Sequence, residues 1–222
     1  MGGKMNTIIL ETERLILRPL SVNDFDAVYA YESDYETVKF MYALSFKPGY
    51  VVPEENTYAF LQECETEWQK DVPAFYEFAV VEKVSKKLIG HIAAYHLDTD
   101  QMEAADEMAT DKPEVAGAPK VADSADLHED PVYPACELGW IFNRAFWGKG
   151  YCTEAALKIK QFALETLGVK KLVAHCDERN LASARVMEKL GMKKNWGNGP
   201  REYPLTGEKS TEAMYALDIK EK

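Results

Sequence analysis

A short loop at residues 143–151 has the residue types and the spacing best suited to chemistry in this sequence. It reads NRAFWGKGY, with Lys149 between Gly148 and Gly150 directly before a predicted helix. Glycines let a backbone approach a ligand closely, and a helix N-terminus favours an anion through its free amides and through its dipole, the latter by about 0.3–1 kcal/mol. Lys149 and Arg144 add positive charge. The pattern predicts a cradle for a pyrophosphate, although a Gly-Lys-Gly sequence also fits a simple turn.

Two familiar phosphate-binding motifs do not fit this loop. A Walker loop requires Ser or Thr after its lysine, whereas Gly150 follows Lys149 here. A dinucleotide-binding GxGxxG motif requires a third glycine where Thr153 stands. The chain that remains after Asp177 is also too short for the further βα units of that fold. Both motifs are therefore excluded.

The hydrophobic pattern predicts strands and helices on both sides of the loop. In residues 12–20, TERLILRPL, apolar and charged residues alternate, with Leu15 and Leu17 on one face, as in a half-buried strand. We predict further strands at Phe75–Val81, Lys87–Leu97, Ala135–Phe142, Lys171–Asp177, Met192–Trp196 and Glu212–Ile219. We predict helices after the cap residues 21–24 to about Tyr31, and at Pro53–Trp68, Gly150–Leu167 and Leu181–Leu190. The helix after Pro53 has an apolar stripe of Tyr58, Leu61 and Trp68.

Residues 98–134 interrupt this periodicity. Between Asp98 and Pro131 the sequence has eleven acidic residues and two lysines, a local charge of −9 out of −11 for the whole chain. Such a composition cannot bury enough apolar surface to offset its ordering entropy. We therefore expect an acidic, mobile insertion between two central strands, which either attracts cationic substrates or serves as a solvated tether.

Length and composition indicate a single cytoplasmic domain over residues 1–222. The hydrophobic fraction of 46% is that of a globular protein, and no apolar run is long enough to span a membrane. The four cysteines are scattered, without a CxxC pair or a histidine at metal-ligand spacing. We expect structural thiols, no metal site, and neither membrane nor nucleic acid as a partner.

Three segments in order resemble the GNAT superfamily of N-acetyltransferases, in particular its RimJ/RimL-like branch. They read TERLILRPLSVNDF, ELGWIFNRAFWGKGYCTEA and DERNLASARVMEKLGM, and together they span residues 12–192. The resemblance implies one α/β GNAT domain, with a mixed, mostly antiparallel central sheet that splays at the cofactor site and is flanked by helices. It also implies acetyl-CoA as co-substrate.

The resemblance carries cofactor-binding roles onto individual positions. The pyrophosphate would bind backbone amides of Gly148, Lys149, Gly150 and Tyr151, with the Thr153 hydroxyl nearby. The pantetheine arm would lie along the strand residues Trp140, Ile141 and Phe142. Asn180 and Ser183 open the last helix, where the family contacts the cofactor, although Asn180 is also a good helix N-cap.

Two positions depart from the family pattern. Ala145 stands where many members have Gln or Arg, and Met187 stands where many have the tyrosine that protonates the leaving thiolate. The RimL-like branch commonly lacks this tyrosine as well. That proton would then come from Ser183, from water or from no group at all.

Direct attack of an amine on a thioester requires a neutral, aligned amine and a proton acceptor. Glu137 opens the strand CELGWIF beside the expected thioester and is the best-placed carboxylate; it is equally well interpreted as an exposed or ion-paired acid at a strand end. His91, inside the strand LIGHIAAY, is the second candidate, but such a histidine is more often a core residue.

We predict acetyl transfer to a primary amine, of a protein N-terminus or another molecule, in a ternary complex by a monomer or homodimer. The alternatives are a small-molecule (polyamine or aminoglycoside) acetyltransferase, and a catalytically quiet acyl-CoA sensor that works through its acidic insertion.

Overall fold

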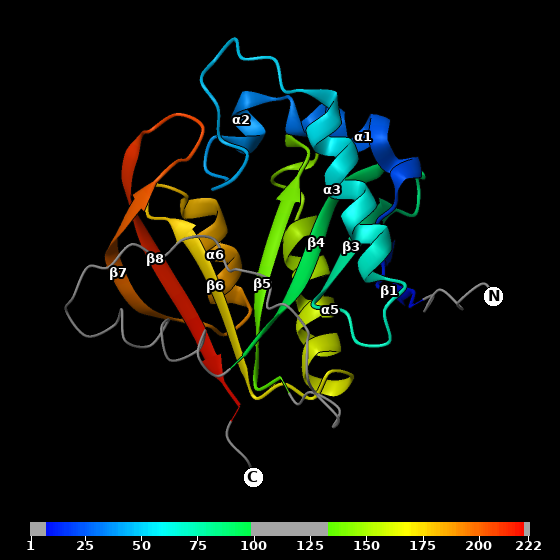
Figure 1. Ribbon diagram of the computed structural model, residues 1–222. Coiled ribbons are helices and arrows are strands. Elements are labelled where there is room, and N and C mark those ends of the chain that lie inside the picture. Colours follow the sequence, from blue (N-terminus) through cyan, green and yellow to red (C-terminus); the bar gives the residue numbers. More distant parts are fainter. Residues whose placement is uncertain (1–7, 99–132, 220–222) are drawn as a thin grey trace.

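The computed structural model describes residues 8–98 and 133–219, and in these ranges the chain forms one eight-stranded sheet with helices on both faces (Figure 1). Seven of these strands are predicted from the sequence, and the two-residue β1 is not. The strands are β1 (Leu10–Glu11), β2 (Leu15–Pro19), β3 (Phe75–Glu82), β4 (Leu88–Leu97), β5 (Ala135–Phe142), β6 (Lys171–Asp177), β7 (Lys193–Glu202) and β8 (Lys209–Asp218). The α-helices are α1 (Phe25–Glu32), α2 (Tyr35–Val38), α3 (Glu54–Glu67), α5 (Tyr151–Glu165) and α6 (Leu181–Lys189). Two 3₁₀ turns, η1 (Val22–Asp24) and η2 (Arg144–Phe146), precede α1 and α5.

The sheet opens into a fork between β5 and β6. The strand order is β1-β2-β3-β4-β5-β6-β8-β7, and every neighbouring pair is antiparallel except β5 and β6. Those two strands pair only through Ala135–Glu137 and Lys171–Val173. Beyond these residues they separate, as Figure 1 shows for the yellow-green and yellow arrows. The predicted splayed, mostly antiparallel α/β sheet is confirmed.

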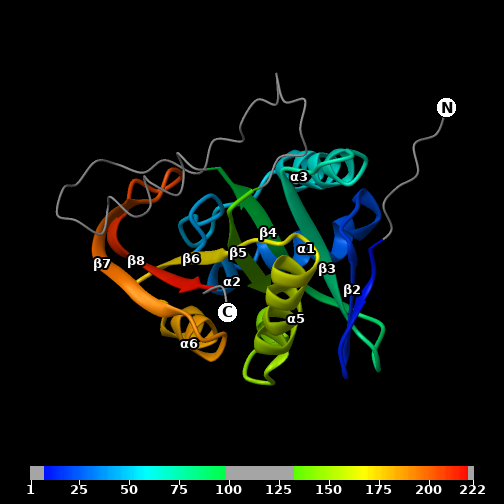
Figure 2. The same ribbon diagram turned by 90° about the horizontal axis from the view of Figure 1, so that it is seen from below.

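The two faces of the sheet are covered by different helices. Figure 2 shows α5 and α6 on one side of the sheet and α3 on the other. The larger core, against α5, contains Phe78, Ile92 and Leu138. The second core, under α1 and α3, contains Leu61, Ala79 and Ile141. Because side chains alternate along β5, its residues contribute to both cores, and the fork lies between them.

Local signals at the N-terminal segment behave as the sequence predicts. Leu15 and Leu17 are fully buried, and Ser21 forms a capping box with Asp24 before α1. Pro53 precedes α3, whose Leu61 is fully buried. Tyr58 departs from the predicted stripe, because its position on α3 leaves it 47% exposed.

The last hairpin is longer than its sequence suggests. β7 runs to Glu202, past Gly197, Gly199 and Pro200, and its pairing with β8 shifts register at Trp196 and again before Gly199. Glycines and proline are depleted in regular strands, so the strand ending predicted at Trp196 is too short.

Several expectations concern residues outside the described ranges. The acidic insertion lies almost wholly in residues 99–132, so its predicted mobility and role stay predictions.

In the described part of the chain, no helix is long and apolar enough to cross a membrane. The cysteines Cys64, Cys136, Cys152 and Cys176 are all free thiols. No group of three or more His, Cys, Asp or Glu side chains in residues 8–98 and 133–219 could hold a metal ion.

Candidate active site

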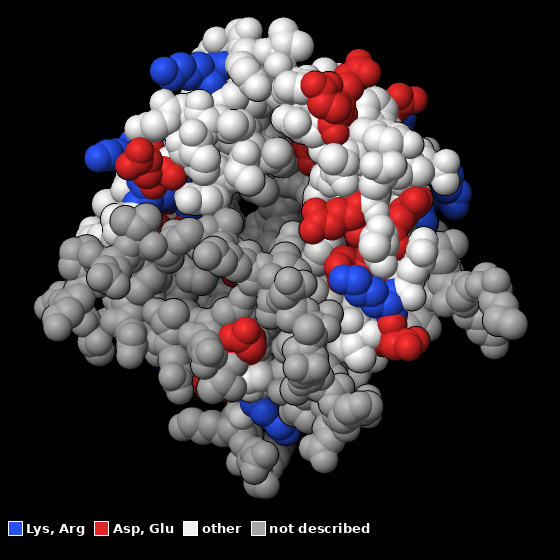
Figure 3. Space-filling model, in the orientation of Figure 1, with Lys and Arg blue, Asp and Glu red and all other residues white. Residues whose placement is uncertain are grey.

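Glu137 lies at the vertex of the fork. It is the last β5 residue paired with β6, opposite Val173, and on its other side it pairs with Tyr95 of β4. Alternation places it on the same face as Ile141, which packs under α1 and α3. The space-filling view shows a recess at the centre of this face, in the region where β5 and β6 separate in Figure 1 (Figure 3).

His175 contacts Glu137 across the start of the opening. Its Nδ1 lies 2.8 Å from Glu137 Oε1, and both side chains are about one-fifth exposed. An ionised carboxylate only accepts hydrogen bonds, so Nδ1 carries the proton when Glu137 is charged. The sequence analysis missed His175. The available signal was its place in the predicted strand 171–177, two residues from Val173 and from Asp177.

Charged side chains from three neighbouring strands surround His175. Burial tends to lower the pKa of His175, but the carboxylates of Glu137 and, more weakly, Glu212 outweigh it, so the pKa is raised above 6.5. Glu212 of β8 forms an ion pair with Arg201 of β7, and the Trp196 ring lies 5.8 Å from the imidazole ring. A carboxylate and an imidazole in contact can take up and pass on a proton near neutral pH.

His91, the second candidate base, is buried on β4, where it pairs with Ile141 of β5. Its Nδ1 is 2.7 Å from the hydroxyl of Tyr31, and it is 6% exposed under α1. Burial lowers the pKa of His91 to about 3, so the ring is neutral at physiological pH. The structure therefore gives His91 a core position.

Glu77 of β3 is a buried acid that contacts Tyr95, the β4 residue paired with Glu137. Glu77 is 1% exposed and accepts a hydrogen bond from the Tyr95 hydroxyl at 3.0 Å. Burial raises the pKa of Glu77 to about 8. Tyr95 also packs over β5, because its ring would lie 3.4 Å from a Cβ placed on Gly139. Tyr95 thus joins the wall of the fork to a buried carboxyl group.

The predicted pyrophosphate loop follows the open end of β5. Gly148 and Gly150 have φ values of +73° and +81°, in the left-handed region that favours glycine, and nothing lies within 4 Å of a Cβ built on Gly148. Gly150 is the N-cap of the 15-residue helix α5 and makes no side-chain cap hydrogen bond. The first amides of α5 therefore have neither a helical nor a side-chain cap acceptor, and the helix dipole points at the loop.

Arg14 adds a positive charge that sequence reasoning did not assign to the loop. Its Nη1 donates to the carbonyl of Lys149 at 3.0 Å, and its guanidinium lies 4.5 Å from the centre of the Tyr151 ring. Glu154, in the first turn of α5, accepts hydrogen bonds from Thr12 and from Arg14. These contacts tie the loop to the start of β2, an arrangement that spacing along the chain cannot reveal.

The remaining predicted loop residues have distinct positions. Lys149 is exposed, with its Nζ 4.9 Å from the Phe146 ring centre. The Tyr151 hydroxyl donates to Glu82 of β3, so its backbone amide and not its side chain faces the loop. Thr153 is half-buried in the first turn of α5.

Trp140 and Ser183 meet on the opposite face of the fork. The indole Nε1 of Trp140 donates to Ser183 Oγ at 3.1 Å, which joins β5 to α6. The Ser183 hydroxyl can still donate its own proton. Asn180 is the N-cap of α6, and its side chain accepts from the Ser183 amide at 3.1 Å. Met187 is 1% exposed in the core beside α5, so its position offers no proton donor.

Ile141 and Phe142 lie on the open stretch of β5, with buried side chains on alternate faces. Their side chains therefore fill the cores, and a ligand in the fork meets the β5 backbone. The carbonyl of Phe142 also accepts from the Trp147 indole at 2.6 Å.

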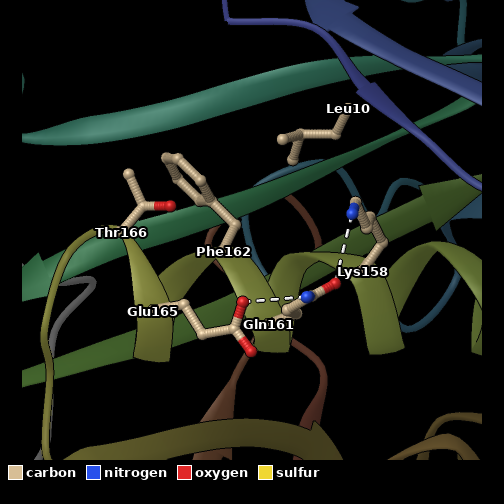
Figure 4. Close-up of a pocket in the computed structure, with 6 residues that line it drawn as sticks. All are labelled: Leu10, Lys158, Gln161, Phe162, Glu165 and Thr166. Carbon is tan, nitrogen blue, oxygen red and sulfur yellow. Dashed lines mark hydrogen bonds between the residues drawn. The ribbon is translucent and has the colours of Figure 1, made fainter.

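A separate small pocket of about 80 Å³ lies between α5 and Leu10 of β1 (Figure 4). Its polar side chains bond to one another: Lys158 donates to Gln161, and Gln161 donates to Glu165. This pocket is remote from Glu137 and from the glycine loop, and we assign it no function.

Comparisons with known proteins identify the family of this chain. The model of the acetyltransferase (GNAT) domain family matches residues 14–193. The chain belongs to the GNAT acetyltransferase family. It is 26% identical to the uncharacterized N-acetyltransferase YnaD of Bacillus subtilis, over 83% of this chain and 82% of that protein.

Solved structures share the fold of this GNAT acetyltransferase. RimL, a ribosomal L7/L12 alpha-N-protein acetyltransferase in complex with coenzyme A, has a TM-score of 0.67 and 16% identity, over 96% of this chain and 98% of RimL. The microcin C7 self-immunity acetyltransferase MccE, in complex with acetyl-CoA and AMP, has a TM-score of 0.65 and 16% identity, over 94% of each chain.

The co-substrate of this GNAT enzyme is acetyl-CoA, and the residues present suit it. The open β5 backbone can pair with an extended pantetheine arm. The uncapped first turn of α5, together with Arg14 and Lys149, suits a pyrophosphate. Acetyl-CoA supplies the activated acetyl group and a thiolate leaving group.

Proposed function

We propose that this acetyltransferase transfers the acetyl group to a primary amine by direct attack, with Glu137 as the proton acceptor and Ser183 as the proton donor. The observation that carries the proposal is the position of Glu137 at the vertex of the fork, half-buried and held by His175 at 2.8 Å. A proton acceptor must lie within hydrogen-bond reach of the attacking amine, and the vertex lies beside the open β5 edge.

The two proposed proton transfers take place on opposite faces of the fork. Glu137 projects to the face under α1 and α3, whereas Ser183 meets Trp140 on the face under α5 and α6. An amine that enters from the face under α1 and α3, where Figure 3 shows the recess, approaches the face that carries Glu137, which takes its proton. On the other face the Ser183 hydroxyl can give a proton to the departing sulfur. Backbone N–H groups of the β5 edge are available for the negative charge that develops on the acyl oxygen.

A cationic amine suits the surface around the recess. Figure 3 shows acidic side chains along the wall over α3, which carries the exposed residues Glu54, Glu55 and Glu63. Negative charge at the mouth of a site raises the local concentration of cationic substrates. The acceptors we favour are peptide N-termini, as named for RimL. A small-molecule acceptor is the second candidate, because MccE, which shares the fold, is in complex with acetyl-CoA and AMP.

The test is release of coenzyme A thiol from acetyl-CoA, measured against peptides with free N-termini, the same peptides with blocked N-termini, polyamines and aminoglycosides. We expect turnover that requires a free primary amine. Turnover of blocked peptides at the same rate, or no turnover with any amine in the panel, contradicts the proposal.

A further inference from the structure

The contact between Glu137 and His175 leads to a second functional residue. We propose that His175 is a positioning residue for Glu137: its Nδ1–H holds one carboxylate oxygen, and protonation of its other ring nitrogen stops Glu137 from accepting the substrate's proton. This inference rests on the proposed role of Glu137 and adds a residue and a control of activity to it.

The hydrogen bond fixes which oxygen of Glu137 is free. Nδ1 of His175 lies 2.8 Å from Oε1, so Oε2 is the atom left for an amine. A glutamate has several side-chain rotamers, and a bond from the neighbouring strand selects among them. The bond also crosses from β6 to β5 just beyond their last paired residues, Glu137 and Val173. It therefore positions the carboxylate where the strands begin to separate.

The charge on His175 controls the basicity of its partner. With a neutral imidazole, Glu137 has one hydrogen bond and can take a proton at Oε2. When Nε2 is also protonated, the imidazolium stabilises the carboxylate as an anion and disfavours its protonation. In this form Glu137 does not take the substrate's proton, and the transfer step does not proceed. The active form of the pair therefore has an ionised Glu137 and a neutral His175.

The groups around His175 determine where this change occurs on the pH scale. The ionisable neighbours that interact with it are Glu137 on β5, Glu212 on β8 and Arg201 on β7. Arg201 acts against protonation of the imidazole, but it is already paired with Glu212. The balance raises the pKa of His175 above 6.5. Protonation of His175 thus begins at a higher pH than that of an ordinary histidine.

Two substitutions separate the hydrogen bond from the titration. In His175→Asn the amide nitrogen can take the place of Nδ1 and donate to Glu137, but it does not titrate. In His175→Ala both properties are lost. We expect the Ala variant to lose about ten- to a hundredfold in kcat at pH 9, the effect of losing one hydrogen bond to a charged group. The Asn variant should lose less.

The decisive readout is the ratio of the kcat of the Asn variant to that of the parent, measured with the same amine from pH 9 to pH 6. Ionisation of the amine is common to both enzymes and cancels. Because the parent loses its neutral imidazole as the pH falls, the ratio should rise at least about fourfold by pH 6 for a pKa above 6.5. A ratio that stays flat, or an Asn variant as impaired as the Ala variant, overturns the proposal.

A second measurement does not depend on turnover. The pKa of His175 is followed by NMR of its imidazole in the full chain, in the parent and in Glu137→Gln. We expect a pKa above 6.5 in the parent and a lower value in the variant; equal values overturn the proposal. If both titrations behave as expected but Glu137→Gln keeps the parental rate, then the assignment of Glu137 fails while the paired titration stands.

Discussion

The buried carboxyl group of Glu77 gives a quantitative test of the structure around the site. Glu77 is 1% exposed, and within residues 8–98 and 133–219 no cation forms a close ion pair with it; His91, which is neutral, lies 3.9 Å away. The Tyr95 hydroxyl donates to one of its oxygens at 3.0 Å. Glu77→Gln keeps the shape and the acceptor for Tyr95, and it removes the ionisation.

The expected size follows from the pKa of Glu77, which burial raises from 4.5 to about 8. Between these values the folded protein binds a proton that the unfolded chain has released. The free energy of unfolding therefore falls as the pH rises from 4.5 and levels off above the folded-state pKa. At about 1.4 kcal/mol for each unit of pKa difference, Glu77 costs the parent about 3 kcal/mol at pH 7 and about 5 kcal/mol at pH 9.

Urea denaturation of the parent and of Glu77→Gln at pH 5, 7 and 9 measures this difference. We expect the two proteins to be similar at pH 5 and the variant to be progressively more stable at pH 7 and 9. Glu63→Gln, on the exposed side of α3, is the matched control and should show no such trend. A pH-independent difference, or a variant less stable than the parent at pH 9, would refute the burial of an unpaired acid at this position.

Two further predictions concern the glycine loop and Ser183. A saturating excess of coenzyme A, about 100 times its Kd, should raise the Tm of the parent by about 5–10 °C. Gly150→Asp should abolish this rise, because a carboxylate enters the loop within reach of Arg14, whose Nη2 lies 3.5 Å from a Cβ built there. Gly168→Asp, also at positive φ but in open space beyond the other end of α5, should keep the rise, and equal behaviour of the two variants would contradict the assigned loop. Ser183→Ala should lower kcat by about tenfold or more without changing the affinity for coenzyme A, whereas Ser183→Thr, which retains a hydroxyl, should recover part of the rate; a parental rate in the Ala variant would remove Ser183 from the reaction.

Much of the fold is predictable because its elements have strong local signals. The alternation in TERLILRPL places Leu15 and Leu17 in the core, and the cap residues Ser21 and Asn180 mark helix starts that the structure retains. The predicted length of β7 is too short, because Gly197, Gly199 and Pro200 are unfavourable in strands. The strand continues through them only because it pairs with β8.

The site was only partly predictable, because contacts across the fork depend on strand register. Glu137 and the glycine loop have recognisable sequence contexts, and the structure places them at the vertex and at the open end of the fork. The contact of His175 with Glu137 depends on a three-residue parallel pairing between segments 38 positions apart. The contact of Arg14 with the loop joins segments 135 positions apart. Local hydrophobic periodicity predicts neither of these contacts.

The rate of acetyl transfer by Glu137→Gln is the most direct test of the account. It should be measured in single turnovers with acetyl-CoA and a reactive amine, alongside the parent and the exposed control Glu188→Gln on α6. We predict a rate about 10²–10⁴-fold below the parent with unchanged affinity for coenzyme A, and a smaller deficit at high pH, where more of the amine is already neutral. A Glu137→Gln variant that transfers acetyl groups as fast as the parent and the control would contradict the central claim.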